Sequence, residues 1–149
     1  MCIRDRYIVS ALKAYKDKSR SHKTMQAQAA NLSDSDMADI GAFFAQMDGN
    51  SRPSLVNKAL AKAGEKYSAS CAACHGKTGD GDQSSFPKLA GQYESYLIQA
   101  LKDYRSGERK DLVMSGQATN LTIGQIKAMS AYFASQEGGL SAPESKIFK

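Results

Sequence analysis

Residues 7–47 of the chain repeat part of its second half without a gap, and this repetition constrains the fold most. When the sequence is shifted by 89 positions, Met25 falls on Met114 and Phe44 falls on Phe133. Other identical pairs are Tyr7 and Tyr96, Leu12 and Leu101, Lys13 and Lys102, Tyr15 and Tyr104, Arg20 and Arg109, Gln28 and Gln117, and Asn31-Leu32 and Asn120-Leu121. Any two amphipathic helices can look alike, because their apolar residues recur with the same period. The match also covers residues 25–32, which we expect to be non-helical and therefore to have no such period. We infer an internal duplication in which both copies have one fold.

The first copy is shorter than the second. At the same shift, residues 57–89 fall before Met1, and residues 1–6 do not resemble residues 90–95. We therefore expect that residues 1–6 are foreign to the protein, that Cys2 has no role and that the native N-terminus is missing. The predicted organisation is a truncated domain at 7–47, a linker at 48–56, a complete domain at 57–137 and a loose tail at 138–149. We expect weak packing along the first copy's apolar stripe, which includes Leu12, Ile40 and Phe44.

Helical patterns dominate the chain, and strand-like alternation is weak throughout. We predict helices at residues 57–70, at 93–105 and from Thr122 onward, joined by a glycine-rich loop at 76–87 and a polar, non-periodic segment at 112–120. Thr122 and Gln125 have the spacing of a capping box, and Ser33 and Asp36 repeat it in the first copy. The predicted fold class is all-α, a small helical domain preceded by a partial copy of itself.

The segment Cys71-Ala72-Ala73-Cys74-His75 is the C-x-x-C-H signature of covalent haem attachment. Its two thiols can add to the two vinyl groups of haem, because a gap of two residues on a helical turn matches the distance between those groups. His75 follows directly, so its imidazole can reach the iron as the proximal ligand. We predict one covalently bound haem c, with its iron, at these three residues.

Two other interpretations of the cysteine pair fit less well. A thioredoxin-like pair follows a strand in a βαβ unit, whereas the surroundings here are helical. A structural zinc site needs four ligands at suitable spacing. Only Cys71, Cys74 and His75 lie close together in the sequence, and the only other histidine is His22.

The sixth iron ligand is expected to be a methionine, since a thioether favours ferrous haem and raises its potential. Met129 lies on the apolar stripe of the last helix with Ile126 and Phe133, so we interpret it as core packing. Met114 lies in the polar segment between two helices, where a loop can place a side chain over the distal face of haem. We therefore predict His75 and Met114 as the iron ligands.

Pro87 is a candidate for orienting the proximal histidine. A histidine that ligates a metal usually donates its other ring N–H to a carbonyl group, which fixes the ring. The Pro87 carbonyl could accept that hydrogen bond, and an ordinary turn proline explains the residue equally well.

Residues 57–137 resemble class I cytochromes c, and among them the diheme periplasmic cytochrome c-four type. The resemblance rests on CAACHG, FPKLAGQYESYLIQALKDYRSGER, Met114 followed seven residues later by Leu121, and IKAMSAYFASQ. It implies two small helical domains, each around one His/Met haem. It also implies that Cys71 and Cys74 bind haem, that His75 and Met114 ligate iron and that Pro87 orients His75. The first copy has no haem motif, so one haem is expected.

The resemblance implies a single-electron shuttle in a periplasmic respiratory chain. The protein is not expected to be an enzyme, because two axial ligands leave no open position on the iron for a substrate. Expected partners are redox proteins such as a terminal oxidase or a quinol–cytochrome c reductase, with membrane association only through them. Two alternatives stay open: a haem peroxidase or sensor with a labile distal ligand, and a cytochrome subunit of a larger dehydrogenase.

Composition agrees with docking onto acidic protein partners. The formal net charge is +5, and the Lys and Arg residues are scattered rather than gathered in a stripe interleaved with aromatics. This argues against nucleic acid as a partner. The sequence contains no run of about 18 apolar residues that could span a membrane.

Overall fold

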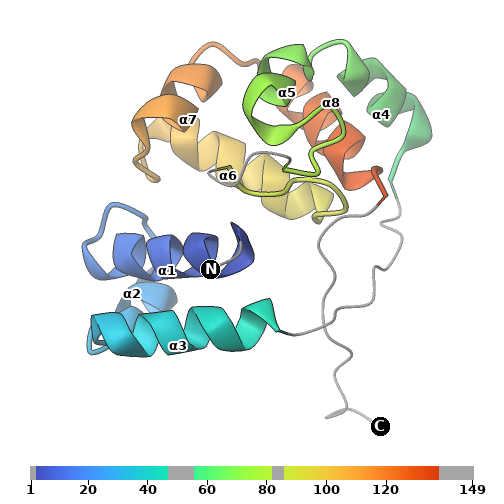
Figure 1. Ribbon diagram of the computed structural model, residues 1–149. Coiled ribbons are helices and arrows are strands. Elements are labelled where there is room, and N and C mark those ends of the chain that lie inside the picture. Colours follow the sequence, from blue (N-terminus) through green and yellow to red (C-terminus); the bar gives the residue numbers. More distant parts are fainter. Residues whose placement is uncertain (1–2, 47–55, 82–85, 138–149) are drawn as a thin grey trace, which may run out of the picture. The chain divides into compact units, whose positions relative to one another are not determined.

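The structure is a computed structural model that describes residues 3–46, 56–81 and 86–137. These residues contain eight helices and no strand, which confirms the predicted all-α class (Figure 1). The helices are α1 Ile3–Lys16, α2 Lys23–Ala29, α3 Asp34–Ala45, α4 Lys58–Glu65, α5 Ala69–His75, α6 Glu94–Ser106, α7 Leu112–Ala118 and α8 Ile123–Ala134. The chain forms two compact units, one of Met1–Gln46 with Ala100–Leu121 and one of Met47–Gln99 with Thr122–Lys149.

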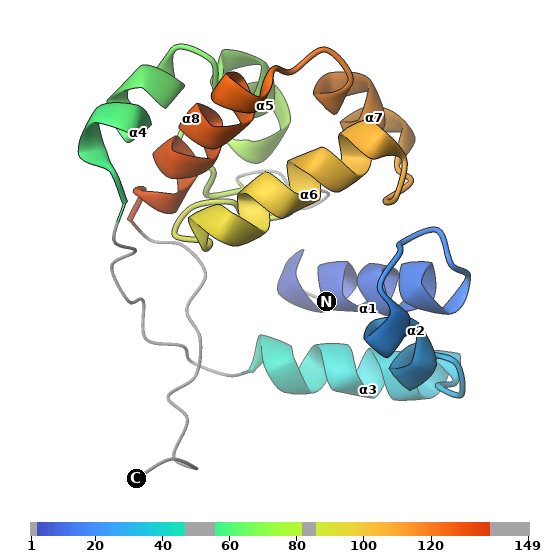
Figure 2. The same cartoon turned by 180° about the vertical axis from the view of Figure 1, so that it is seen from behind.

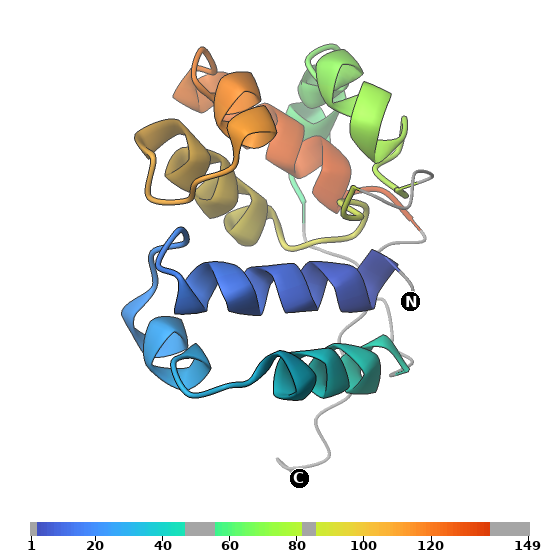
Figure 3. The ribbon, with the colours of Figure 1, turned by 60° about the vertical axis from the view of Figure 1, so that its left-hand side comes forward.

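In the first unit, α1 and α3 lie side by side, with α2 at one end of the pair (Figure 3). Ser33 and Asp36 form the predicted capping box at the start of α3. Gly41 faces α1, where an added Cβ would lie 3.0 Å from the Asp5 carbonyl oxygen and 3.0 Å from Val9 Cγ2. The two helices can approach this closely because Gly41 has no side chain.

In the second unit, α4 crosses α8 (Figure 2). An added Cβ on Gly64 would collide with the Ala128 carbonyl group, so the crossing requires a glycine here. Thr122 and Gln125 form the predicted capping box of α8, and the predicted stripe is buried, with Met129 1% exposed and Phe133 3% exposed.

The predicted helix at residues 57–70 is wrong, since the segment contains two helices and a turn. Asn57 caps α4 by accepting a hydrogen bond from Leu60 N–H, and α4 ends at Glu65. The Ser68 hydroxyl and backbone N–H both donate to the Glu65 carbonyl, which tightens the chain into a turn. The next helix, α5, begins at Ala69 and contains the C-x-x-C-H motif.

The expectation that residues 25–32 and 112–120 are non-helical is also wrong. Helix α2 (Lys23–Ala29) overlaps the first segment and α7 (Leu112–Ala118) lies within the second. Each helix has seven residues and is too short to show a period. Their starts are fixed by side-chain caps, because His22 accepts from Met25 N–H and Asp111 accepts from Met114 N–H. Shifted by 89 positions, α2 coincides with α7 and α3 coincides with α8.

Equivalent segments of the two copies pair with each other inside the first unit. Arg20 and Arg109 form an antiparallel β-bridge. Two backbone hydrogen bonds of 2.8 Å flank the bridge, from Ser21 N–H to the Glu108 carbonyl and from Lys110 N–H to the Ser19 carbonyl. The shift of 89 positions relates Ser21 to Lys110 and Ser19 to Glu108, so the two hydrogen bonds are equivalent. The contact between the two copies is therefore locally two-fold symmetric.

The predicted domain limits stay predictions. Cys2, residues 48–55 of the linker and the tail at 138–149 lie outside the described residues. Within residues 1–6, α1 already begins at Ile3, and Asp5 is 8% exposed. In the part of the chain that is described, no helix is long and apolar enough to span a membrane.

Candidate haem site

Helix α5 places three of the predicted site residues together. Cys71 and Cys74 lie about one turn apart, and both are free, half-buried thiols. His75 is the last residue of the helix and is 4% exposed. Gly76 ends the helix with a φ of 82°, a conformation that residues with a side chain rarely adopt. The chain therefore changes direction at the residue that follows His75.

The His75 ring is hydrogen-bonded to the backbone of Pro87. The Pro87 carbonyl oxygen lies 2.8 Å from His75 Nδ1. A carbonyl oxygen can only accept, so Nδ1 carries the proton and Nε2 keeps its lone pair. Burial lowers the pKa of His75, and the hydrogen bond to Pro87 partly opposes that shift. The neutral imidazole, which is the form that binds a metal, is therefore favoured.

The loop between α5 and α6 holds the Pro87 carbonyl in place. Gly79 accepts backbone hydrogen bonds from Leu89 and Ala90, at 2.7 and 2.9 Å. The Tyr132 hydroxyl of α8 donates to the Lys77 carbonyl at 3.0 Å. An added Cβ on Gly79 would lie 2.7 Å from the Phe133 ring. Because these contacts tie the loop to α8, the position of the His75 acceptor depends on the packing of the last helix.

Met129 packs against the first cysteine of the motif. The Cys71 Sγ lies 3.9 Å from the Met129 Sδ, and burial raises the pKa of the Cys71 thiol. Met129 is almost fully buried on α8. This placement supports its interpretation as a packing residue.

Met114 lies on α7, in the first unit. Its side chain is half-buried, and its backbone N–H donates to Asp111 Oδ1 at 2.9 Å. A short capped helix, rather than the expected irregular loop, therefore presents this thioether. The second unit contains the other predicted site residues, Cys71, Cys74, His75 and Pro87. That Met114 and His75 ligate the same iron stays a prediction.

Sequence reasoning missed two aromatic residues that support the site. Phe86 makes an edge contact with the His75 ring, with 6.0 Å between ring centroids. Tyr132 anchors the loop through Lys77. The position of Phe86 directly before Pro87 could have suggested the first contact, but nothing in the sequence indicated the second.

The donors fit a covalently attached haem. Two thiols about a turn apart can form thioethers, and His75 offers a neutral ring nitrogen for iron while Pro87 fixes the other. Among the described residues, no group of three or more His, Cys, Asp or Glu is arranged to hold a metal ion. Porphyrin supplies most of the iron ligands in haem, so such a group is not needed here.

Comparisons with known proteins show which family the chain resembles. The family Cytochrome c matches residues 61–137. Cytochrome c4 of Pseudomonas aeruginosa is 46% identical over 77 residues, which are 52% of this chain and 38% of that protein. A thiosulfate dehydrogenase electron acceptor of Stutzerimonas stutzeri is 33% identical over 141 residues, 86% of this chain and 65% of that protein. The solved structure of cytochrome c4 from Acidithiobacillus ferrooxidans superimposes with a TM-score of 0.79 at 31% identity, covering 89% of this chain and 85% of that one.

The chain spans only part of the curated relatives that it matches, between 38% and 61% of the first four. The family match nevertheless covers just over half of the chain and includes the C-x-x-C-H motif, Pro87 and Met114. On this match and the high structural similarity, the chain belongs to the cytochrome c family.

Proposed function

We propose that the protein carries single electrons through one haem c, bound by Cys71 and Cys74 and ligated by His75 and Met114. Membership of the family implies a covalently bound haem c with iron. When bound, haem c supplies the reversible exchange of one electron between ferrous and ferric iron. The observation that best supports the proposal is the 2.8 Å contact between His75 Nδ1 and the Pro87 carbonyl, directly beside the cysteine pair.

Each site residue has one task in this proposal. Cys71 and Cys74 would hold the cofactor covalently through thioethers. Pro87 holds Nδ1 of the imidazole and leaves Nε2 free to bind iron, and the burial of His75 would keep water away from that nitrogen. Met114 would supply its thioether as the second protein ligand of the iron, which would raise the reduction potential. Two protein ligands would leave a substrate no access to the iron, which favours a carrier over an enzyme.

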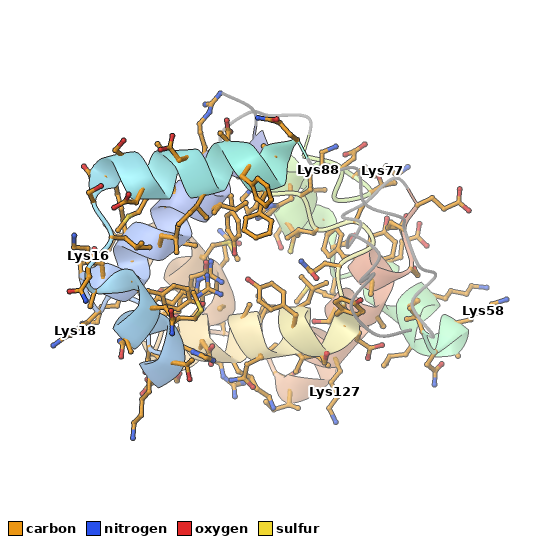
Figure 4. All side chains as sticks on the ribbon, turned by 90° about the horizontal axis from the view of Figure 1, so that it is seen from below. Lys16, Lys18, Lys58, Lys77, Lys88 and Lys127 are labelled. Carbon is orange, nitrogen blue, oxygen red and sulfur yellow. The ribbon has the colours of Figure 1, made fainter. Side chains whose placement is uncertain are left out.

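We propose a periplasmic redox partner with an acidic surface. The lysines labelled in Figure 4 are all exposed, and the formal net charge of +5 would steer an acidic partner towards the protein. Candidate partners are a terminal oxidase and a quinol–cytochrome c reductase. One relative is named for accepting electrons from thiosulfate dehydrogenase, so a dehydrogenase is a further candidate.

Substitution of the two candidate methionines tests the proposal. The oxidised protein should show the weak near-infrared sulfur-to-iron charge-transfer band. Met114→Ala should remove this band, lower the potential and allow carbon monoxide to bind the reduced protein. Met129→Ala is the matched control, and it should keep the band while destabilising the fold by about 2–5 kcal/mol.

Two results would contradict the proposal. A band that survives Met114→Ala and disappears in Met129→Ala would transfer the ligand role to Met129. An unsubstituted protein that has no band and binds carbon monoxide readily would instead be a peroxidase or a sensor with an open distal position.

A further inference from the structure

The loop between α5 and α6 is held at both ends by neighbouring residues of α8. Near the start of the loop, the Tyr132 hydroxyl donates a hydrogen bond of 3.0 Å to the Lys77 carbonyl. At the end of the loop, the Gly91 N–H donates to the Phe133 carbonyl, also at 3.0 Å. Pro87 lies between these two contacts in the sequence. The last turn of α8 therefore holds both ends of the segment that includes Pro87.

Of these two contacts, only the one from Tyr132 depends on a side chain. The Tyr132 side chain is buried, and an added Cβ on Gly64 of α4 would lie 3.0 Å from the Tyr132 Cβ. The Tyr132 ring also makes an edge contact with the Phe133 ring, with 5.1 Å between ring centroids. Because the crossing with α4 and the Phe133 ring confine Tyr132, its hydroxyl has little freedom to leave the Lys77 carbonyl.

The equivalent helix of the first copy has no hydroxyl at this position. At the shift of 89 positions, Tyr132 falls on Phe43 of α3, which has the same ring without the hydroxyl. Helix α3 has the length and the capping box of α8, so the helix itself does not require the hydroxyl. The hydroxyl thus occurs in the copy that contains the C-x-x-C-H motif, and phenylalanine replaces tyrosine in the copy without this motif. A role of the hydroxyl in the haem site would explain this difference.

The hydrogen bond from His75 to Pro87 determines how basic the imidazole is as a ligand. When Nδ1–H donates to a firmly held carbonyl, the ring gains negative charge and Nε2 becomes a stronger donor to a metal. A stronger donor stabilises ferric iron relative to ferrous iron, which lowers the reduction potential. The position of the Pro87 carbonyl would therefore contribute to the potential of a haem that His75 ligates.

We propose that Tyr132 is a positioning residue for the His75 ligand. Its hydroxyl holds Lys77, and through the loop it keeps the Pro87 carbonyl within hydrogen-bond distance of the imidazole. This inference rests on the proposed function, because it concerns the potential of the proposed haem. Without the hydroxyl, the loop keeps its contact at Gly91 but loses the one at Lys77. The hydrogen bond to His75 then weakens, the imidazole becomes a poorer donor and the reduction potential rises.

The test removes the hydroxyl by Tyr132→Phe in the protein with its haem attached. Lys77 is exposed, so water can satisfy its carbonyl in the variant and the fold should be kept. Redox titration gives the ratio of reduced to oxidised haem at a fixed ambient potential. Proton NMR of the reduced protein gives the rate at which the His75 Nδ1–H exchanges with solvent. We expect the ratio to rise about twofold, which corresponds to the loss of one weak hydrogen bond, and the proton to exchange faster.

Tyr67→Phe is the matched control, because it removes a tyrosine hydroxyl from the turn before α5 but leaves the contact with Lys77 in place. It should change neither the ratio nor the exchange rate. Urea unfolding separates positioning from a purely structural role. A Tyr132→Phe variant that unfolds more easily but keeps both values would overturn the inference, and so would equal changes in the two variants. If the unsubstituted protein attaches no haem, the proposed function fails first, and the role of Tyr132 fails with it.

Discussion

Helices α3 and α8 are copies of one helix, yet they are buried to very different degrees. Both have twelve residues and begin with a capping box. On α8, Tyr132 is 8% exposed and Phe133 is 3% exposed, whereas the equivalent Phe43 and Phe44 of α3 are 58% and 45% exposed. Helix α8 packs against α4, while α3 packs against α1. An apolar stripe along a helix therefore indicates which face can be buried. How much of that face is buried depends on the helix that packs against it.

The largest expected difference between the two copies concerns their equivalent phenylalanines. Phe133→Ala should destabilise the fold by about 3–5 kcal/mol, because it leaves a cavity beside Tyr132 and Leu97 in the core. Phe44→Ala removes a half-exposed ring and should cost less than about 1 kcal/mol. Urea unfolding followed by circular dichroism measures both. Equal costs would mean that α3 buries its apolar face as well as α8 does.

Amide hydrogen exchange sharpens the same comparison without a substitution. Buried contacts are denser around α8 than around α3, so the amides of α8 should exchange more slowly.

A second expected difference concerns the glycines at the two helix crossings. Gly64→Ala should cost about 2–3 kcal/mol, at the upper end for overpacking, because the added methyl group meets the Ala128 carbonyl and neither backbone can rotate away. Gly41→Ala is the control. Its contacts of 3.0 Å oppose a gain of about 1 kcal/mol in helix propensity, so its net effect should be close to zero. Thermal unfolding of both variants checks this, and a cost for Gly41→Ala as large as that for Gly64→Ala would show that the two crossings are equally tight.

The smallest expected effect concerns the turn that follows α1 and α6. Lys18 has a φ of 65°, and the equivalent Gly107 has a φ of 83°. Only the glycine adopts this conformation without strain, so Lys18→Gly should stabilise the protein by about 0.5–1 kcal/mol. Gly107→Lys should destabilise it by a similar amount. Matched shifts of opposite sign in the urea midpoint are expected, and shifts of the same sign would show that the two turns are not equivalent.

Sequence patterns predicted the parts of the fold that depend on local chemistry. The two capping boxes and the buried stripe of α8 follow from side chains three or four residues apart. For Pro87, the sequence allowed two equal interpretations, an acceptor for His75 and an ordinary turn proline. The hydrogen bond between the two residues supports the first. Local chemistry was sufficient in each case because the interacting groups are close in the chain or belong to a known ligand pattern.

The features that sequence reasoning missed depend on distant contacts or on very short elements. Helices α2 and α7 span only seven residues, so their caps rather than any period define them. The turn at residues 66–68 divides a segment whose apolar pattern looks continuous. The need for a glycine at position 64 also depends on a distant contact, because Gly64 meets the backbone of Ala128, 64 positions later in the chain.

The pairing of residues 19–21 with residues 108–110 has a consequence for the origin of the duplicated chain. Both flanking hydrogen bonds join backbone groups, so they do not depend on which side chains the copies have kept. Two identical single-copy chains could form the same pair of bonds across a true two-fold axis, as a self-complementary homodimer does. Fusion of two such genes would then turn a contact between subunits into a contact within one chain, and each copy could afterwards change its side chains independently.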